Sequence, residues 1–269
     1  MNQSQGPTSV KSDRVRALRR LSQRAFRRQV GRFLAEGPQV VREAVTHRPD
    51  TVVEVFVAQA APDPAAEVAT AARLAGLPVV EVSEQVLLAI TETVHPQGIA
   101  AVCTYLDQPP EELLIGARLA VLLDRVRDPG NAGTILRTAD AAGADAVFFT
   151  DSSVDIYNGK CVRSSVGSIF HLPVAVNVIA VDIVKLAREA GLVSLAADAG
   201  GELEIPAAEQ ILRQPTMWLL GNEAHGLAEE LAMAVDHRVA VPIYGRAESL
   251  NLAAAASVCL YASAFAQSS

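Results

Sequence analysis

The chain has 269 residues, and half of them are hydrophobic, which is enough to bury the cores of two modest domains or one large one. Aromatic residues make up only 4% of the chain, so we expect a core built mainly from Ala, Val, Leu and Ile. The three cysteines are widely spaced and match neither a disulfide framework nor a zinc-ligand spacing. This usage predicts a protein of a reducing compartment that holds no metal ion.

Neither end of the chain suggests a membrane protein. The first fourteen residues contain no apolar segment of the kind found in signal peptides. The longest apolar stretch, residues 252–266, is short for a membrane span and contains two serines. We therefore expect a soluble cytoplasmic protein.

The net charge of −7 is distributed unevenly along the chain. Residues 1–48 hold eleven Lys and Arg against three Asp and Glu, a net charge of +8, so the remainder carries −15. A cluster of arginines is a candidate phosphate-binding surface, because each neutralised phosphate releases counterions. The alternative is a solvated helical face without a ligand. The candidate phosphate contacts are Arg19, Arg20, Arg27 and Arg28.

The first hundred residues predict a small α/β unit. Residues 1–12 are polar and are expected to lack regular structure. Two helices are expected next, a basic one at 13–30 and one at 33–47 with apolar residues at helical spacing. Strands and helices then alternate, and this pattern predicts strands at 51–58, 77–83 and 98–106 and helices at 65–76 and 84–92.

Residues 108–116 are the best candidate for a domain boundary, because two prolines and an acidic pair interrupt the alternating pattern. With this boundary, we expect the chain to have four parts. They are a basic segment (1–29), a small α/β domain (30–106), a linker (107–117) and a larger domain (118–269).

The strand–helix alternation restarts after this boundary. Alternating elements predict a parallel sheet with helices on both faces. The expected strands are 118–124, 145–150, 172–176, 192–198, 216–221 and 237–243, and the expected helices are 132–144, 160–168, 181–191, 226–235 and 249–266.

The last predicted helix is apolar nearly all the way round. A helix on the surface of a monomer normally keeps one polar face. Burial against a second copy of the chain would explain the pattern, so we predict a homodimer. Packing of an alanine-rich helix inside one chain is the alternative.

Three polar loops follow three of the predicted strands. The first is Asp124–Arg137, where Asn131 occupies the expected cap position of the next helix. The second is Gly221–Leu227, and the third is Tyr244–Asn251, in which Ser249 is positioned to cap the last helix. In a parallel sheet these loops share the carboxyl edge, which is where ligands bind.

The three loops resemble the three motifs of the SpoU/TrmH family, which are S-adenosylmethionine-dependent RNA ribose 2′-O-methyltransferases of the SPOUT superfamily. The matching patterns are Asn131-x-Gly133-x3-Arg137, Gly221-Asn222-Glu223-x2-Gly226-Leu227 and Pro242-x6-Ser249-Leu250-Asn251. The resemblance covers residues 118–265, and residues 30–106 more loosely resemble the substrate-binding domain of that family. It implies a parallel α/β SPOUT fold with a deep trefoil knot, within about residues 216–255, that builds the cofactor site.

The resemblance assigns the adenosine pocket to the knot loops. Gly221 permits close approach of the backbone, and the apolar neighbours can enclose an adenine. Ordinary core packing is the alternative for Val241 and Leu250. The residues that match the cofactor site are Leu219, Gly221, Asn222, Val241, Ile243 and Leu250.

Arg137 resembles the catalytic arginine of the family, which is proposed there to act as a general base. Because arginine stays protonated in proteins, we expect Arg137 instead to bind the substrate phosphate and stabilise the developing alkoxide. Asn131 is expected to orient Arg137 and the target ribose. Ser249 and Asn251 match the third motif near the ribose. Glu223 is expected to order the knot loop or contact substrate, and not to bind a metal.

Residues 158–171 resemble a loop and helix of the family in which Lys160, Arg163 and Ser164 are expected to contact RNA phosphates. His171 and His225 are expected to be structural. The resemblance implies RNA as the partner, with 23S rRNA preferred and tRNA possible. A non-catalytic RNA-binding protein that retains the scaffold is a further alternative, although the presence of all the motif residues argues against it.

Overall fold

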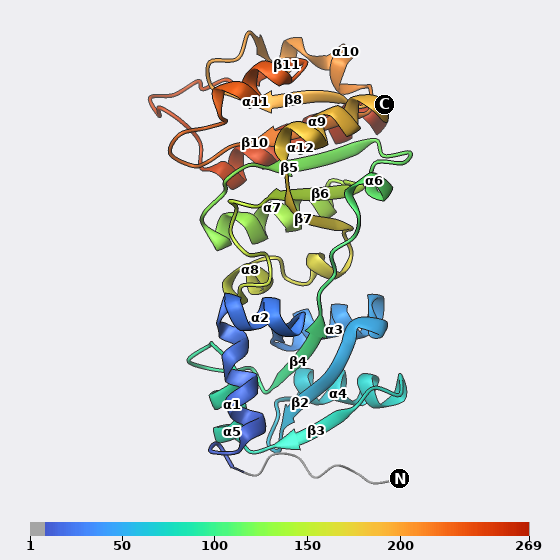
Figure 1. The fold of residues 1–269 in the computed structure, drawn as a ribbon, viewed down its shortest axis with the longest axis vertical. Coiled ribbons are helices and arrows are strands. Elements are labelled where there is room, and N and C mark those ends of the chain that lie inside the picture. The colour runs from blue at the N-terminus through green and yellow to red at the C-terminus, as the bar shows by residue number, and fades with distance from the viewer. Residues whose placement is uncertain (1–8, 269) are drawn as a thin grey trace. The chain divides into compact units, whose positions relative to one another are not determined.

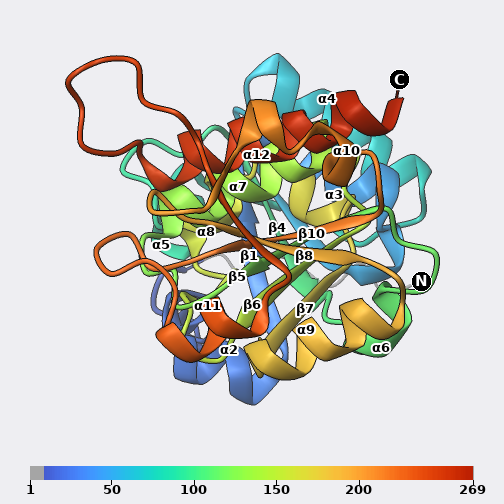
Figure 2. The same ribbon diagram turned by 90° about the horizontal axis from the view of Figure 1, so that it is seen from above.

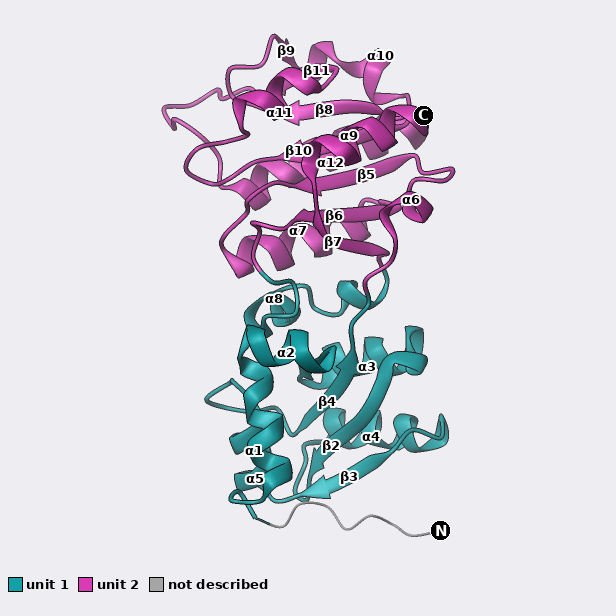
Figure 3. Ribbon diagram, viewed as in Figure 1, with its two compact units in different colours: residues 1–106, 155–171 teal, residues 107–154, 172–269 magenta. Residues whose placement is uncertain are grey.

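The computed structural model describes residues 9–268, so most of the segment expected to lack regular structure lies outside the described part. The chain forms two compact units (Figure 3). Unit 1 comprises Met1–Leu106 and Asp155–His171, and unit 2 comprises Asp107–Val154 and Leu172–Ser269. Residues 155–171 thus pack in unit 1, whereas the sequence pattern places them in the larger domain.

Unit 1 is built on a four-stranded mixed sheet with the strand order β1-β4-β2-β3 (Figure 1). Strand β4 pairs antiparallel with both β1 and β2, and β2 pairs parallel with β3. The strands are β1 (Arg32–Glu36), β2 (Val52–Ala58), β3 (Val79–Val82) and β4 (Ile99–Thr104). The helices are α1 (Asp13–Arg19), α2 (Arg24–Val30), α3 (Pro38–His47), α4 (Asp63–Leu74), α5 (Glu84–Ile90) and α8 (Gly159–Ser164).

Two predicted helices of unit 1 differ from the observed elements. The helix expected at 13–30 is divided by a 3-10 turn at Arg20–Ser22. The helix expected at 33–47 begins as strand β1, whose Phe33 pairs with Cys103 of β4. Gly37, at a φ of 94°, then turns the chain, and Pro38 starts α3. The apolar run 33–35 therefore joins the sheet, where all three side chains are buried.

Unit 2 is built on a seven-stranded sheet with the order β7-β6-β5-β10-β8-β11-β9, and every recorded pair is parallel. The strands are β5 (Leu119–Leu123), β6 (Ala146–Thr150), β7 (Val174–Val178), β8 (Val193–Ala197), β9 (Leu203–Glu204), β10 (Thr216–Leu220) and β11 (His237–Ala240). The helices are α6 (Pro110–Leu113), α7 (Pro129–Ala141), α9 (Ala180–Glu189), α10 (Glu209–Leu212), α11 (Glu229–Ala234) and α12 (Leu252–Ser268).

Helices cover both faces of this sheet, as the alternating pattern predicts. Helices α7, α10 and α12 lie on one side, and α6, α9 and α11 lie on the other (Figure 2). The central strands β5 and β10 are buried along their whole length, as expected for a parallel sheet between two helical layers. Short elements in the segment between β8 and β10, β9 and α10, have no counterpart in the sequence prediction.

The last helix is anchored to the centre of the sheet by a buried polar contact. The Trp218 indole Nε1 of β10 donates a hydrogen bond to Ser263 Oγ of α12 at 2.9 Å, and Thr216 Oγ1 lies 3.1 Å from the same oxygen. This contact holds α12 over β10, so the start of α12 lies near the carboxyl edge of the sheet. No helix in the described part of the chain is long and apolar enough to cross a membrane.

Candidate functional site

The loops that follow β5, β10 and β11 meet at the carboxyl edge of the sheet in unit 2. Strands β5 and β10 are direct neighbours, with Leu123 paired with Leu220, so the first two loops leave the sheet side by side. The third loop runs from β11 to the start of α12. The predicted convergence of these loops is seen in side-chain contacts between all three.

The first loop leads into α7 through an aspartate cap. Asp128 is the N-cap residue, and its carboxylate accepts a hydrogen bond from the backbone N–H of Asn131 at 2.8 Å. The prediction that Asn131 caps this helix is therefore wrong, because the helix begins two residues earlier, at Pro129. Asn131 lies in the first turn, and its side chain is left to contact the other loops.

Glu223 of the second loop joins that loop to the start of α7. Its carboxylate accepts hydrogen bonds from the backbone N–H groups of Arg127 and Asp128 at 3.2 and 3.1 Å. It also accepts from Asn131 Nδ2 at 3.3 Å. Partial burial acts to raise the pKa of Glu223, but its backbone hydrogen bonds and the Asn131 amide outweigh it, and the pKa is lowered. Glu223 is therefore an ionised anchor between the loops, and it is a weaker base than an ordinary carboxylate.

Asn251 brings the third loop to the same point. Its Nδ2 donates a hydrogen bond to Asn131 Oδ1 at 3.1 Å. Its Oδ1 accepts from the backbone N–H of Ala253 at 2.9 Å, so Asn251 is the residue that caps α12. Ser249, the cap expected from the sequence, is instead exposed at the rim of the cavity described below. A continuous chain of hydrogen bonds thus runs from Asn251 through Asn131 to Glu223.

The second loop folds back on itself around Asn222. Its Nδ2 donates to the carbonyl of Arg125 at 2.9 Å, and its Oδ1 accepts from the backbone N–H groups of Ala224 and His225. A Cβ atom on Gly221 would collide with the backbone of Gly226 and Leu227, so only glycine fits at this position. The loop closes tightly and leaves its backbone exposed to the space beside it.

A cavity of about 470 Å³ opens between the second and third loops and the end of β8. This volume is within the ordinary range for a site that holds a small molecule. Five of the six residues predicted to bind a cofactor line it, and these are Gly221, Asn222, Val241, Ile243 and Leu250. Leu219 does not, because it is fully buried within β10.

The structure adds residues to this cavity that the sequence motifs do not include. Ala197, Asp198 and Ala199 contribute from the end of β8, and Glu248 contributes from the third loop. The position of β8 beside β10 could not be read from the sequence. The available signal was the polar residue Asp198 at the end of the predicted strand 192–198.

Arg137 lies on the exposed face of α7 and does not line the cavity. Its guanidinium forms no hydrogen bond or ion pair with any residue from 9 to 268. The next residue, Thr138, instead faces α12, with its hydroxyl 3.4 Å from Ser257 Oγ. An exposed guanidinium without an intramolecular partner is available to a ligand or to a second chain.

A second hollow of about 390 Å³ shares the Asn222–His225 loop and carries two arginines that lie outside the three motifs. Arg125 and Arg127 line it, and the side chain of Arg127 is exposed. Arg125 has a φ of 52° and holds its Nε 2.9 Å from Asp124 Oδ2. This hollow places two basic side chains on the surface beside the cavity.

The predicted RNA contacts of unit 1 divide into exposed and buried residues. Arg19, Arg20 and Arg28 are exposed. Arg27 is only 2% exposed, and its Nη2 lies 2.6 Å from Asp155 Oδ2 while its Nη1 donates to the carbonyl of Leu21. The prediction that Arg27 contacts RNA is wrong, because its guanidinium is enclosed and already paired.

The segment around α8 is also partly occupied by internal contacts. Arg163 Nη1 lies 3.2 Å from the buried carboxylate of Glu36 and 4.0 Å from that of Glu92. The Ser164 hydroxyl donates to the carbonyl of Lys160. Lys160 is exposed at the start of the helix. Of these three predicted phosphate contacts, Lys160 is the one whose side chain is displayed to solvent.

Comparison with known proteins gives matches for both parts of the chain. The SpoU rRNA Methylase family model matches residues 118–261, and the MRM3-like substrate binding domain model matches residues 12–101. The chain is 38% identical to the 23S rRNA (guanosine(2553)-2′-O)-methyltransferase RlmP of Bacillus subtilis, over 94% of this chain and 96% of that protein.

Solved structures with the same fold cover nearly the whole chain. The SpoU methyltransferase AviRb from Streptomyces viridochromogenes matches with a TM-score of 0.83 and 29% identity, over 95% of this chain and 98% of that one. The AdoMet-bound rRNA methyltransferase from Sinorhizobium meliloti matches with a TM-score of 0.81 and 32% identity, over 96% of both chains.

Proposed function

The chain belongs to the SpoU rRNA methylase family, and on this premise we propose that it methylates the 2′-hydroxyl of a ribose in 23S rRNA, with S-adenosylmethionine as the methyl donor. Two observations support ribosomal RNA as the substrate. The similar RlmP and the similar Sinorhizobium protein are both named as rRNA methyltransferases. Residues 12–101 also match a substrate-binding domain. Transfer RNA is the alternative substrate, and the cytoplasm, where ribosomes are assembled, is the proposed place of action.

The observation that carries the proposal is the chain of hydrogen bonds from Asn251 through Asn131 to Glu223. It joins the three motif loops at the rim of the cavity and holds their polar groups in one arrangement. A preorganised set of dipoles is what stabilises charge that develops during a reaction. A scaffold that only bound RNA would not need this link between the cavity and the start of α7.

The cavity fits the methyl donor of the family. When it is bound, S-adenosylmethionine supplies an electrophilic methyl group on its sulfonium sulfur. Val241, Ile243 and Leu250 would enclose the adenine, and Gly221 would let the backbone approach it closely. The trefoil knot expected at residues 216–255 stays a prediction for the segment that builds this cavity.

Arg137 is proposed to act on the RNA and not on the methyl donor. Its exposed guanidinium has no partner among the described residues, so it can bind a substrate phosphate through two hydrogen bonds. It also places positive charge near the ribose oxygen that loses its proton, and that proton passes to phosphate or water. Arg125 and Arg127 supply two further basic side chains, in the hollow that shares the Asn222–His225 loop with the cavity.

We propose further that the active form is a homodimer. Helix α12 buries Ala256, Cys259 and Leu260 inside the protomer, but Val258 and Phe265 on the same helix are 41% and 66% exposed. Burial of these apolar side chains against a second copy would remove them from water. In this arrangement Arg137 serves the cavity of the partner subunit, which explains why it lies outside the cavity of its own.

The test is transfer of tritiated methyl groups from S-adenosylmethionine to separate pools of 23S rRNA and tRNA, followed by mapping of alkali-resistant 2′-O-methylated positions. We expect label at one site in 23S rRNA, and far less label with the Arg137→Ala variant in the same time. Label only in tRNA would replace the proposed substrate. Label in neither pool, by protein that binds S-adenosylmethionine, would contradict the enzymatic proposal.

A further inference from the structure

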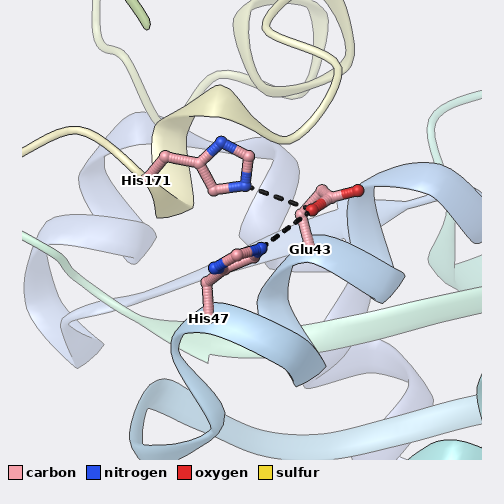
Figure 4. Close-up of side chains that lie close together, drawn as sticks. All are labelled: Glu43, His47 and His171. Atoms are coloured by element: carbon pink, nitrogen blue, oxygen red, sulfur yellow. Dashed lines mark hydrogen bonds and ion pairs between the residues drawn. The ribbon is translucent and has the colours of Figure 1, made fainter. Parts of the chain in front are cut away.

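Three side chains with metal-ligating atoms converge in unit 1. Glu43 and His47 are four residues apart on α3 and so share one face of the helix, and His171 follows the 3-10 turn Ser168–Phe170 (Figure 4). His171 Nε2 lies 3.1 Å from Glu43 Oε2, and His47 Nε2 lies 3.4 Å from the same oxygen. The centroids of the two imidazole rings are 4.4 Å apart.

We propose that Glu43, His47 and His171 form a binding site for a divalent transition-metal ion such as Zn²⁺. One ligand atom from each residue lies within 4.8 Å of the other two, so small side-chain rotations bring all three around one ion. Two imidazole nitrogens and one carboxylate oxygen suit Zn²⁺, with water completing a tetrahedral site. Mg²⁺ and Ca²⁺ prefer sites made of oxygen alone, so they are poor candidates.

The surroundings of Glu43 hold its carboxylate in position for this role. The side chain is only 16% exposed, and Gln39 Nε2 donates a 2.7 Å hydrogen bond to Oε1, which leaves Oε2 directed at the two histidines. A Cβ atom on Gly167 would collide with the Glu43 side chain, so a glycine, here at a φ of 101°, makes room for it. Outer-shell hydrogen bonds of this kind orient the ligands of metal sites.

Within the described part of the chain, other side chains are less suited to bind the ion. The three cysteines are buried, and burial raises the pKa of the Cys103 and Cys259 thiols, so both stay protonated. No other group of three His, Cys, Asp or Glu side chains between residues 9 and 268 comes as close together. The sequence predicts a structural His171 and no bound metal, because no local pattern indicates that His171 contacts α3.

A bound ion would connect two distant parts of the chain. Glu43 and His171 are 128 residues apart, and His171 ends the segment 155–171 that packs in unit 1. Coordination would replace the His171–Glu43 hydrogen bond and the His47–Glu43 ion-pair contact, both to one carboxylate oxygen, with three bonds to a metal. Because protons compete with the metal for imidazole nitrogen, binding should weaken in acid.

The experiment is titration of chelator-treated, full-length protein with Zn²⁺, followed by isothermal calorimetry and by the shift in thermal unfolding temperature. We expect one equivalent to bind and to raise the unfolding temperature. His47→Ala should weaken binding about 100-fold or more, as should His171→Ala. The matched control is His95→Ala, which removes an exposed histidine of unit 1 outside the cluster and should bind like the wild type.

His47 is half exposed, so its replacement tests the site without a loss of packing. Substitution of Co²⁺ gives a second measurement, because visible absorption of tetrahedral intensity is expected from the wild type and not from His47→Ala. The proposal is overturned if the wild type binds no Zn²⁺ at micromolar concentration. It is also overturned if His47→Ala and His171→Ala both bind Zn²⁺ as the wild type does. Neither result depends on methyl transfer.

Discussion

Asn131 occupies the centre of the site because its amide is both a donor and an acceptor. It donates to Glu223 through Nδ2 and accepts from Asn251 through Oδ1. An aspartate at this position would lose the donor and place a second negative charge beside Glu223. The chemical identity of one residue therefore decides whether three loops are held together.

The first prediction at the residue scale concerns Arg137 and the rate of methyl transfer. Arg137→Ala should lower the rate of methyl transfer about 100-fold, since it removes a charged group that stabilises the transition state. Arg137→Lys should remain at least about tenfold slower than the wild type, because a lysine keeps the charge but loses the planar fork. Single-turnover methylation and calorimetric binding of S-adenosylmethionine measure the two steps separately.

The control for this prediction is Arg213→Lys, which changes the exposed arginine at the C-cap of α10 that pairs with Glu209 outside the cavity. It should leave methyl transfer unchanged. Near wild-type turnover of Arg137→Lys would show that positive charge alone suffices. Loss of cofactor binding by Arg137→Ala would show that Arg137 belongs to the cofactor site of its own subunit.

The second prediction concerns Glu223 and the dependence of stability on pH. Its pKa is lowered in the folded protein by hydrogen bonds from backbone N–H groups and from Asn131. A lowered carboxyl pKa stabilises the fold above the unfolded-state value of about 4.3, and this stabilisation is lost as the pH falls through the folded-state value. Glu223→Gln should therefore lower the unfolding temperature at pH 7 and at pH 5.5, and the difference from the wild type should shrink below about pH 4.

Glu230→Gln, at an exposed position of α11, is the matched control and should show no difference at either pH. Thermal unfolding followed by circular dichroism across this pH range is the measurement. A difference between Glu223→Gln and the wild type that persists unchanged in acid would refute the assignment of Glu223 as an ionised anchor.

Among the secondary-structure elements, helix α2 contains two neighbouring arginines, of which one is buried and the other is exposed. Arg27 is enclosed with Asp155, while Arg28, one residue later, is exposed. Neighbouring residues of one helix therefore differ in role: Arg27 holds unit 1 together, and Arg28 is exposed to solvent. The sequence groups them because a cluster of arginines has the same composition whichever way its members face.

The third prediction follows from the different burial of Arg27 and Arg28. Arg27→Ala should reduce the free energy of unfolding by about 3 kcal/mol, because Asp155 would be left as a nearly buried charge without its partner. The combined variant Arg19→Gln, Arg20→Gln and Arg28→Gln should lower stability less than Arg27→Ala does, because these three side chains are exposed, although Arg20 lies over the Phe26 ring with its guanidinium carbon 4.0 Å from the ring centroid. It should instead reduce the slope of log affinity for RNA against log salt by about 0.7 to 0.9 for each phosphate that is no longer neutralised.

Urea denaturation and RNA binding at several salt concentrations measure the two effects. An unchanged salt slope in the triple variant would show that the exposed arginines form a solvated face and bind no phosphate. Unchanged stability in Arg27→Ala would contradict the structural role of the buried pair.

The fourth prediction concerns the whole molecule and its second copy. If Arg137 serves the partner's cavity, two inactive variants should complement each other. Arg137→Ala keeps an intact cavity, and Leu250→Asp places a charge in the cavity while keeping Arg137. A heterodimer of the two has one site with both parts intact, so mixing and refolding should recover up to about a quarter of wild-type activity.

Methyl transfer by mixtures of the two variants is the measurement, and light scattering establishes the mass. No recovery from a mixture that forms heterodimers would place Arg137 and the cavity of one subunit in the same site. A monomeric mass at micromolar concentration would contradict the dimer itself.

The alternation of strands and helices in unit 2, and the loops in which the candidate site lies, could be predicted from the amino-acid sequence. Hydrophobic periodicity and glycine positions are local, so a few residues carry the signal. Five of the six candidate cofactor residues line one cavity at the ends of strands. The assignment of Leu219 to the cofactor site, which rests on the family resemblance, is wrong because Leu219 is fully buried within β10, two residues before Gly221, which lines the cavity.

Which distant residues meet could be learned only from the folded chain. The run 33–35 reads as part of a helix until its pairing with β4 is known. Arg27 meets Asp155, and Glu43 meets His171, each across 128 residues of chain. Such contacts depend on the packing of whole elements and on strand order, whose free energies are summed over many residues and leave no local pattern. The local sequence therefore predicts the loops of the candidate site, while the buried ion pair and the proposed metal site arise from packing.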